Sequence, residues 1–183
     1  MVKGIKNMKF KILRNIILVN LVYILIASNN LIGNDYIGNP KVEVGIESIK
    51  ELDDANYVIS IYSINPYDII AGIQFKFIPS DVFTIESIYG GRTEEKDFQI
   101  HFNKNGTVLG FSMIGNTLDL SRTTSGPNKA IDNIICIVNA SINNLDKYNT
   151  TETLELEFVI ASKDGESLST KTVPFNMSKV LNK

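Results

Sequence analysis

The sequence contains one cysteine, Cys136, one histidine, His101, and no tryptophan among its 183 residues. A single cysteine allows neither an intrachain disulfide nor a cluster of thiolate metal ligands. The histidine stands in FQIHF, without HExxH spacing or a second histidine, which excludes the usual zinc hydrolase sites. No serine occupies a G-x-S-x-G motif either. We therefore expect no metal, no cofactor and no enzymatic activity.

An excess of basic charge is also missing from the sequence. Lys and Arg number 18 against 20 Asp and Glu, which gives a formal net charge of −2. A protein that binds nucleic acid neutralises phosphates with a basic surface, so we expect no nucleic-acid partner. The hydrophobic content of 44% and the charged content of 21% are typical of a folded globular domain.

Long apolar runs are confined to the N-terminal region. Lys9, Lys11 and Arg14 precede an apolar run over residues 16–27, and small and polar residues follow it. This order is typical of a secretory signal peptide, and retention of the segment as a membrane anchor is the alternative. We assign residues 1–33 to this segment and residues 40–178 to a β-sandwich domain. The protein is therefore expected outside the cell or on its surface, with membrane contact only through an uncleaved N-terminus.

Hydrophobic residues alternate with polar ones through most of the remaining chain. The alternating runs are KVEVGIESI, YVISIYSI, AGIQFKF, FTIESIY, FQIHF, TVLGFSM, TLELEFVI and TKTVPF, and turn-forming residues separate them. IDNIICIVNASI contains an apolar run that is continuous rather than alternating, which indicates a strand buried on both faces. About nine short strands predict an all-β fold, an antiparallel, jelly-roll-like β-sandwich. Helix is expected at most as one or two turns near residues 143–152.

The alternation also assigns side chains to the two faces of each strand. Gln74, Lys76, Gln99 and His101 are predicted on an outer sheet face, where they are the candidate binding residues. The inward set is Ile73, Phe75, Phe77, Phe98, Ile100, Phe102, Leu109, Phe111, Met113, Leu154, Leu156, Phe158 and Ile160. Gly110 in GTVLGFSMIGNTL is thereby predicted on the outer face, and Gly115 at the end of the strand, where positive φ is useful.

Three segments, AGIQFKF, GTVLGFSMIGNTL and FVIASKDGESLST, resemble the cohesin-like sandwich domains of secreted bacterial proteins. That family has a GxQF strand, a VLGFSxxGxTI strand and a late SDxxGxxL hairpin in the same order. The resemblance extends over residues 42–175. The sequence departs from it after the glycine strand, where DLSRTTSGPNKAIDNI replaces the family's IPAGSGxL loop.

The resemblance implies a nine-stranded sandwich and a non-catalytic binding role. Its partner would be a dockerin-like protein module or a polysaccharide, bound through one sheet face or through rim loops. A sugar platform would have to use Tyr62, Tyr67 or Tyr89, because the phenylalanines are mostly predicted inside. A protein partner is therefore slightly favoured. The alternative is a structural subunit of a surface layer, pilus or adhesin that assembles with copies of itself.

Overall fold

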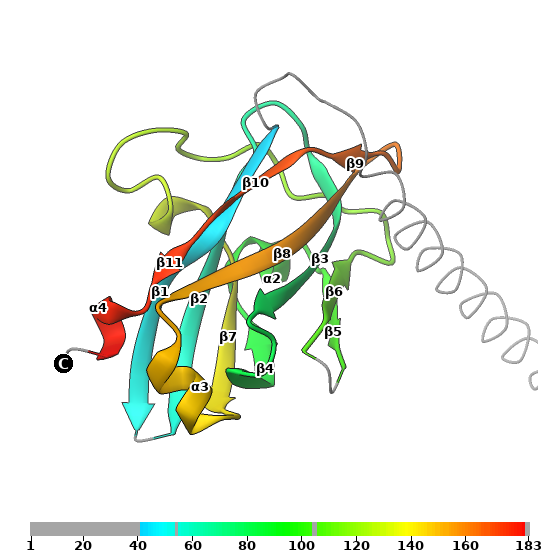
Figure 1. Ribbon diagram of the computed structural model, residues 1–183. Coiled ribbons are helices and arrows are strands. Elements are labelled where there is room, and N and C mark those ends of the chain that lie inside the picture. Colours follow the sequence, from blue (N-terminus) through cyan, green and yellow to red (C-terminus); the bar gives the residue numbers. More distant parts are fainter. Residues whose placement is uncertain (1–40, 54, 104–105, 182–183) are drawn as a thin grey trace, which may run out of the picture. The chain divides into compact units, whose positions relative to one another are not determined.

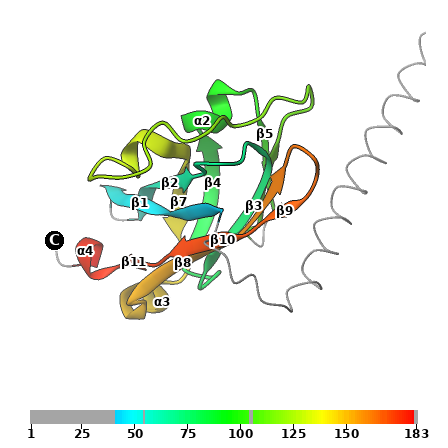
Figure 2. The same ribbon diagram turned by 90° about the horizontal axis from the view of Figure 1, so that it is seen from above.

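Two β-sheets packed face to face form the domain in the computed structural model, which describes residues 41–53, 55–103 and 106–181 (Figure 1). The first sheet has the strand order β10–β1–β2–β7–β4, and the second has the order β11–β8–β3–β6–β5, with β9 paired to β8. Figure 2 views the same two layers from above. The predicted all-β sandwich is confirmed.

The strands follow the predicted alternating runs closely. Nine of them correspond to the nine expected strands, and β9 and β11 add two residues each. Their bounds are β1 Val42–Asp53, β2 Asn56–Ile64, β3 Ile70–Ile78, β4 Phe83–Tyr89, β5 Gln99–Phe102, β6 Val108–Phe111, β7 Ile134–Ile142, β8 Thr153–Ser162, β9 Ser167–Leu168, β10 Thr170–Val173 and β11 Phe175–Asn176. The helical elements are α2 Gly91–Glu95, the 3₁₀ turn η1 Ile131–Asn133, α3 Leu145–Thr150 and α4 Ser178–Leu181.

The core lies between the sheets and uses most of the predicted inward side chains. On β3, Ile73, Phe75 and Phe77 are buried, and the alternate residues of β8 from Leu154 to Ile160 are buried with them. The rings of Phe75 and Phe158 stack with centroids 5.3 Å apart. Burying side chains of this size stabilises the fold by roughly 1.5–3 kcal/mol each.

The C-terminal segment closes one side of the sandwich. β10 pairs in parallel with β1 of the first sheet, and β11 pairs with β8 of the second sheet. Pro174 lies between them and has no N–H to donate to a sheet, which suits the position where the chain changes sheets. On the opposite side, β4 and β5 are the last strands of their sheets.

Helix α3 covers one end of the core. Its first turn is capped by the side chain of Asn144, which accepts a hydrogen bond from the backbone N–H of Lys147. Tyr148 is buried, and its ring lies 5.3 Å from Tyr57 and 5.8 Å from Phe83, measured between centroids. Burial raises the pKa of the Tyr148 hydroxyl well above its usual range.

The predicted orientation of β6 is wrong by one residue. Gly110 pairs with Ile73 on β3 and Ile100 on β5, so it occupies the core-facing row, while Leu109 and Phe111 face outward. Met113 lies beyond the strand and is exposed. Both faces of this strand carry apolar residues, so hydrophobicity alone could not fix which face is inside.

Gly110 makes room for two isoleucines in the core. A Cβ at this position would lie 2.6 Å from Cδ1 of Ile100 and 2.9 Å from Cγ1 of Ile73. Both distances are too short for carbon–carbon contact. The glycine in the strand is therefore a packing requirement of the core, and the expected shallow spot on the outer surface is wrong. Gly115 has φ of 82°, as expected at the end of the strand.

Three further expectations are corrected by the structure. Residues 131–133 form η1 and do not belong to β7, whose outer face is only half buried. GGRTEEKD is expected from the sequence to form a turn but contains helix α2. At the start of this helix, a Cβ on Gly91 would lie 2.6 Å from the backbone of Ile135. Phe102 has the predicted inward orientation but is 42% exposed, because β5 is an edge strand.

The segment predicted as a signal peptide or anchor, residues 1–33, lies outside the described residues. The domain boundaries at 40 and 178 stay a prediction. Among the described residues, no helix combines the length and the hydrophobicity needed to cross a membrane.

Replacement of Gly110 by valine tests the packing at this position. We expect Gly110→Val to lower the free energy of unfolding by about 1–3 kcal/mol, because the new side chain overpacks the core against Ile73 and Ile100. Urea unfolding followed by circular dichroism measures the change. The matched control is Gly72→Ala, whose Cβ would meet Cβ of Ala161 at an ordinary 3.7 Å and should leave stability equal or higher. Equal stability of Gly110→Val and the wild type would contradict this account of β6.

Candidate partner-binding face

The outer surface of the second sheet, here called the β8–β3–β6–β5 face, is built from cross-strand rows. One row contains Val159, Gln74, Leu109 and His101, one residue from each strand in that order. Residues opposite one another in neighbouring strands have Cβ atoms roughly 4.5–5.5 Å apart. An apolar leucine is therefore flanked by the amide of Gln74 and the imidazole of His101.

The adjacent row of this face contains Ala161, Gly72, Phe111 and Gln99. Phe111 is 8% exposed although it points away from the core. Its neighbours on β3 and β8 carry no side chain larger than a methyl group, which leaves space over the sheet for a ring. The centroid of Phe111 lies 6.2 Å from that of His101 on the same face. Phe111 and Leu109 thus give the face an apolar centre.

Charged residues follow on the other side of the Gln74 row. Lys76 and Glu157 are cross-strand neighbours, and Nζ of Lys76 lies 3.0 Å from Oε2 of Glu157. Ile78 and Glu155 form the last pair of the series. An exposed ion pair of this kind contributes only about 0–1 kcal/mol to stability. Both charges therefore remain accessible to a ligand at little cost.

The structure brings all four predicted site residues, Gln74, Lys76, Gln99 and His101, to this one face. Their role in binding stays a prediction. Leu109 and Phe111 also belong to this face, although the alternation of the sequence predicted both in the core. The pairing of Ile73 with Gly110, and so of Gln74 with Leu109, is information that local alternation does not contain.

The outer face of the first sheet differs, because Lys129 of the long segment 112–133 reaches it. Tyr62 is 5% exposed and packs over Gly45, and its hydroxyl donates a hydrogen bond to Oε1 of Glu43 at 3.3 Å. The same Glu43 oxygen accepts from Nζ of Lys129 at 2.8 Å. Burial, together with Glu43, raises the pKa of Tyr62 far above its usual range. Tyr62 is therefore no exposed sugar platform.

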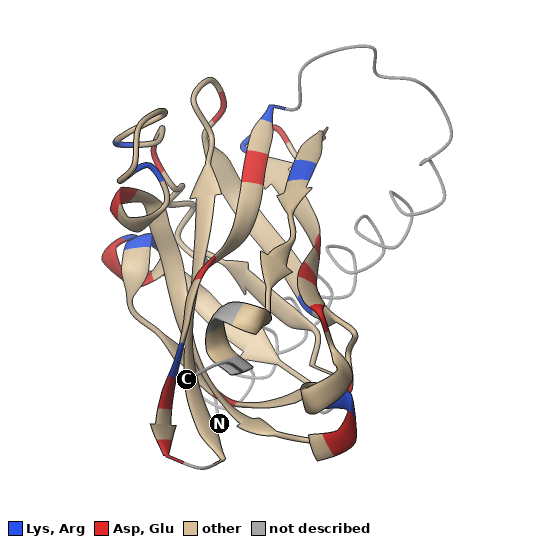
Figure 3. Ribbon diagram, turned by 60° about the vertical axis from the view of Figure 1, so that its left-hand side comes forward, with Lys and Arg blue, Asp and Glu red and all other residues tan. Residues whose placement is uncertain are grey.

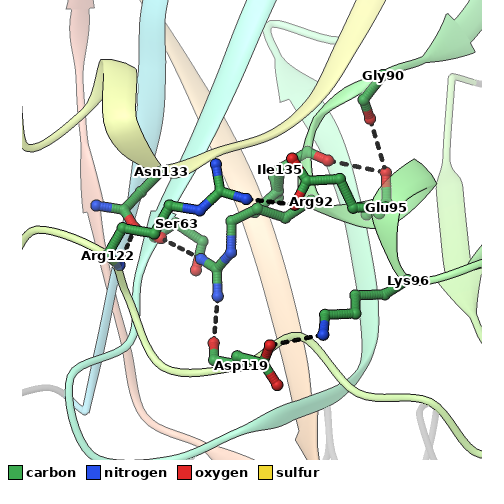
Figure 4. Close-up of polar contacts among 10 residues, drawn as sticks. Ser63, Gly90, Arg92, Glu95, Lys96, Asp119, Arg122, Asn133 and Ile135 are labelled. Carbon is green, nitrogen blue, oxygen red and sulfur yellow. Dashed lines mark hydrogen bonds and ion pairs between the residues drawn. The ribbon is translucent and has the colours of Figure 1, made fainter.

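A buried arginine anchors the segment 112–133 to the rest of the domain. Arg92 of α2 is 4% exposed and donates to the carbonyl of Ser63 at 3.2 Å (Figure 4). A second acceptor is Oδ1 of Asn65, at 3.1 Å. Arg92 also donates to the carbonyl of Asp119. Burial is the main cause that lowers the pKa of Arg92, with a smaller contribution from Arg122. All three acceptors are uncharged, so the guanidinium connects backbone segments and forms no buried ion pair.

Two buried asparagines extend this polar network. Nδ2 of Asn65 donates to the carbonyl of Asp119 at 2.9 Å, and Nδ2 of Asn133 donates to the carbonyls of Thr123 and Lys129 at 2.6 and 2.7 Å. We call Arg92, Asn65, Asn133 and these partners the Arg92 network. The local sequence GGRTEEKD does not predict that its arginine is buried, because the hydrogen-bond acceptors of Arg92 lie far away in the sequence.

Surface charges surround the network without one sign dominating. Lys96 lies 2.6 Å from Asp119, and its hydrogen bond is the main cause that lowers the pKa of that carboxyl. Arg122 pairs with Glu95. In the described part of the chain, Figure 3 shows basic and acidic segments interspersed.

The single cysteine, Cys136, is fully buried, and this burial raises the pKa of its thiol to about 12. Among the described residues, no group of three or more Asp, Glu, His or Cys side chains could hold a metal ion.

Comparisons with known proteins find cohesin modules among solved structures. No protein-family model and no curated protein matches the chain. A non-cellulosomal cohesin from Archaeoglobus fulgidus is 15% identical with a TM-score of 0.46, covering 74% of this chain and 90% of that chain. A type I cohesin–dockerin complex from Clostridium thermocellum is 11% identical with a TM-score of 0.46, and the match covers 74% of this chain and 98% of that chain. The cohesin module of a family 33 glycoside hydrolase from Clostridium perfringens is 12% identical with a TM-score of 0.44, and the match covers 75% of this chain and 95% of that chain.

These solved structures belong to the family that the three sequence segments resemble. At such identities and TM-scores, the likeness assigns neither a ligand nor a binding residue to this chain.

Removal of the Arg92 guanidinium should destabilise the domain. We expect Arg92→Met to lower the free energy of unfolding by about 2–4 kcal/mol, because it leaves the buried acceptors of Ser63, Asn65 and Asp119 with fewer donors. Chemical denaturation measures the loss, and limited proteolysis should show faster cleavage within 112–133. The matched control, Arg122→Met, removes an exposed ion pair and should cost less than about 1 kcal/mol. Equal effects of the two substitutions would show that Arg92 does not anchor the segment.

Proposed function

We propose that this chain is an exported, non-catalytic binding module, cohesin-like, that binds a dockerin-like protein module through the β8–β3–β6–β5 face. The observation that carries this proposal is the outward orientation of Leu109 and Phe111 at the centre of that face. The support for export is the order of basic, apolar and small residues in 1–33, which is typical of a signal peptide.

The composition of the face suits a protein partner. Protein interfaces combine an apolar centre with a polar, solvent-accessible rim. Here Leu109 and Phe111 supply the centre, and Gln74, Gln99 and His101 supply hydrogen-bonding groups around it. The exposed Lys76–Glu157 pair adds one charge of each sign, with which a partner could form new ion pairs.

The two outer faces of the sandwich also differ in whether their side chains already have intramolecular hydrogen-bond partners. On the first sheet, Tyr62 and Glu43 already have intramolecular partners from within the domain. On the second sheet, the centre of the outer face is instead the apolar pair Leu109 and Phe111, which carries no polar side-chain group that a partner would have to desolvate. These differences favour the second sheet as the binding surface.

The test is a substitution that places a charge in the centre of the face. We expect Leu109→Asp to weaken binding of a dockerin module by at least about 30-fold, because a carboxylate would be desolvated in the apolar centre of the interface. Isothermal titration calorimetry against a panel of purified dockerin modules measures the affinities of wild type and variant.

The matched control is Leu145→Asp, which introduces the same charge at an exposed position on α3 and should bind as the wild type does. Circular dichroism confirms that both variants are folded. Absence of binding by the wild type at high micromolar concentration would refute the proposal. Concentration-dependent self-association in light scattering, abolished by Leu109→Asp, would instead support the self-assembling subunit.

A further inference from the structure

A cleft of about 510 Å³ lies at the side of the sandwich where the sheet edges β4 and β5 meet. Its lining comes from Ser80 and Asp81 before β4, from β4 itself, from the end of β5 at Phe102 and from Asn143 after β7. This volume falls within the range of roughly 300–1,000 Å³ that is typical of small-molecule sites. The cleft is separate from the β8–β3–β6–β5 face, because it opens between the sheets.

The cleft follows from the way in which the two sides of the sandwich end. On the side of β10 and β11, the chain crosses from one sheet to the other and covers the core. On the side of β4 and β5, each sheet ends in an edge strand, and β5 has only four residues. Phe102 lies in the same cross-strand row as Phe75 and Val108, which are buried, yet it is 42% exposed. A core-facing aromatic ring therefore lines the cleft.

Polar groups converge on the same cleft from three segments. Nδ2 of Asn143 donates to the carbonyl of Asp81 at 3.2 Å, which fixes the two loops relative to each other. Oδ2 of Asp81 lies 3.2 Å from Nζ of Lys147. Ser80 adds a hydroxyl and Asn103 an amide to the lining. These groups offer donors and acceptors around an apolar ring.

The charge of the lining restricts the ligand class. Asp81 is the one ionisable residue among the described residues that line the cleft, and its charge is already balanced by Lys147. The site therefore lacks the unpaired cations needed for an anionic ligand and the clustered carboxylates needed for a cation. An uncharged ligand with an apolar face and a hydroxylated edge fits this combination.

We propose that this cleft binds a neutral carbohydrate. The ring of Phe102 lies against the C–H face of a sugar, where polarised hydrogens meet the negative face of the aromatic ring. Asp81, Asn143 and Ser80 form hydrogen bonds with hydroxyl groups at the edge of the sugar. The site is independent of the proposed protein-binding face, so the two proposals can fail separately.

Titration of the ¹⁵N-labelled protein with cellotetraose, xylotetraose and mannotetraose tests the proposal. We expect at least one of these sugars to give saturable chemical-shift changes in the amides of Phe102 and Asn143. Tetragalacturonate, an anionic chain of the same length, should bind at least about tenfold more weakly, because the cleft offers no unpaired cation to compensate the desolvation of its carboxylates. Absence of saturable changes with all three neutral sugars, or preference for the anionic one, would overturn the proposal.

Variants at Phe102 separate binding from folding. Phe102→Leu keeps an apolar side chain and should weaken sugar binding by about tenfold, whereas Phe102→Tyr keeps the aromatic face and should remain within about threefold of wild type. Leu109→Asp, which alters the other face, should bind the sugar with unchanged affinity. Equal affinity of Phe102→Leu and wild type would overturn the role of the ring and with it the proposed site.

Discussion

The stacking of two sheets on one shared apolar layer is the constraint on which the rest of the molecule depends. The inward side chains of β3 and β8, including Phe75 and Phe158, use one face of the second sheet entirely for this contact. Gly110 serves the same contact, because its missing side chain gives Ile73 and Ile100 their space. Binding surfaces can then exist only on the outer faces, at the open edges or in the loops.

The two outer faces of the sandwich differ in structure, and so do its two sides. The Arg92 network holds the segment 112–133, and Lys129 of that segment reaches Glu43 on the outer face of the first sheet. The corresponding face of the second sheet presents Leu109 and Phe111 outward. The C-terminal strands cover the core on one side of the sandwich, and the cleft beside Phe102 opens on the other. The proposed protein-binding face and the proposed sugar-binding cleft both follow from this asymmetry.

The sequence predicted the fold class, nine of the strands and the outward orientation of Gln74, Lys76, Gln99 and His101. A period of two identified eight of these strands, and a continuous apolar run identified β7. The alternation failed where both faces of a strand are apolar, as in β6, where pairing across the sheet decides the orientation. The sequence pattern also did not reveal the Arg92 network, because the three acceptors of Arg92 are 27 to 29 residues away from it in the chain. The exposure of Phe102 depends on the position of β5 at the sheet edge, which no local pattern encodes.

Methyl NMR of the domain, alone and saturated with a dockerin module that it binds, tests the central claim most directly. If the β8–β3–β6–β5 face binds the partner, the methyl signals of Leu109 and Val159 shift or broaden, while those of Val58 and Ile137 on the outer face of the first sheet stay unchanged. The reverse pattern, with Val58 and Ile137 perturbed and Leu109 and Val159 unaffected, would contradict the account.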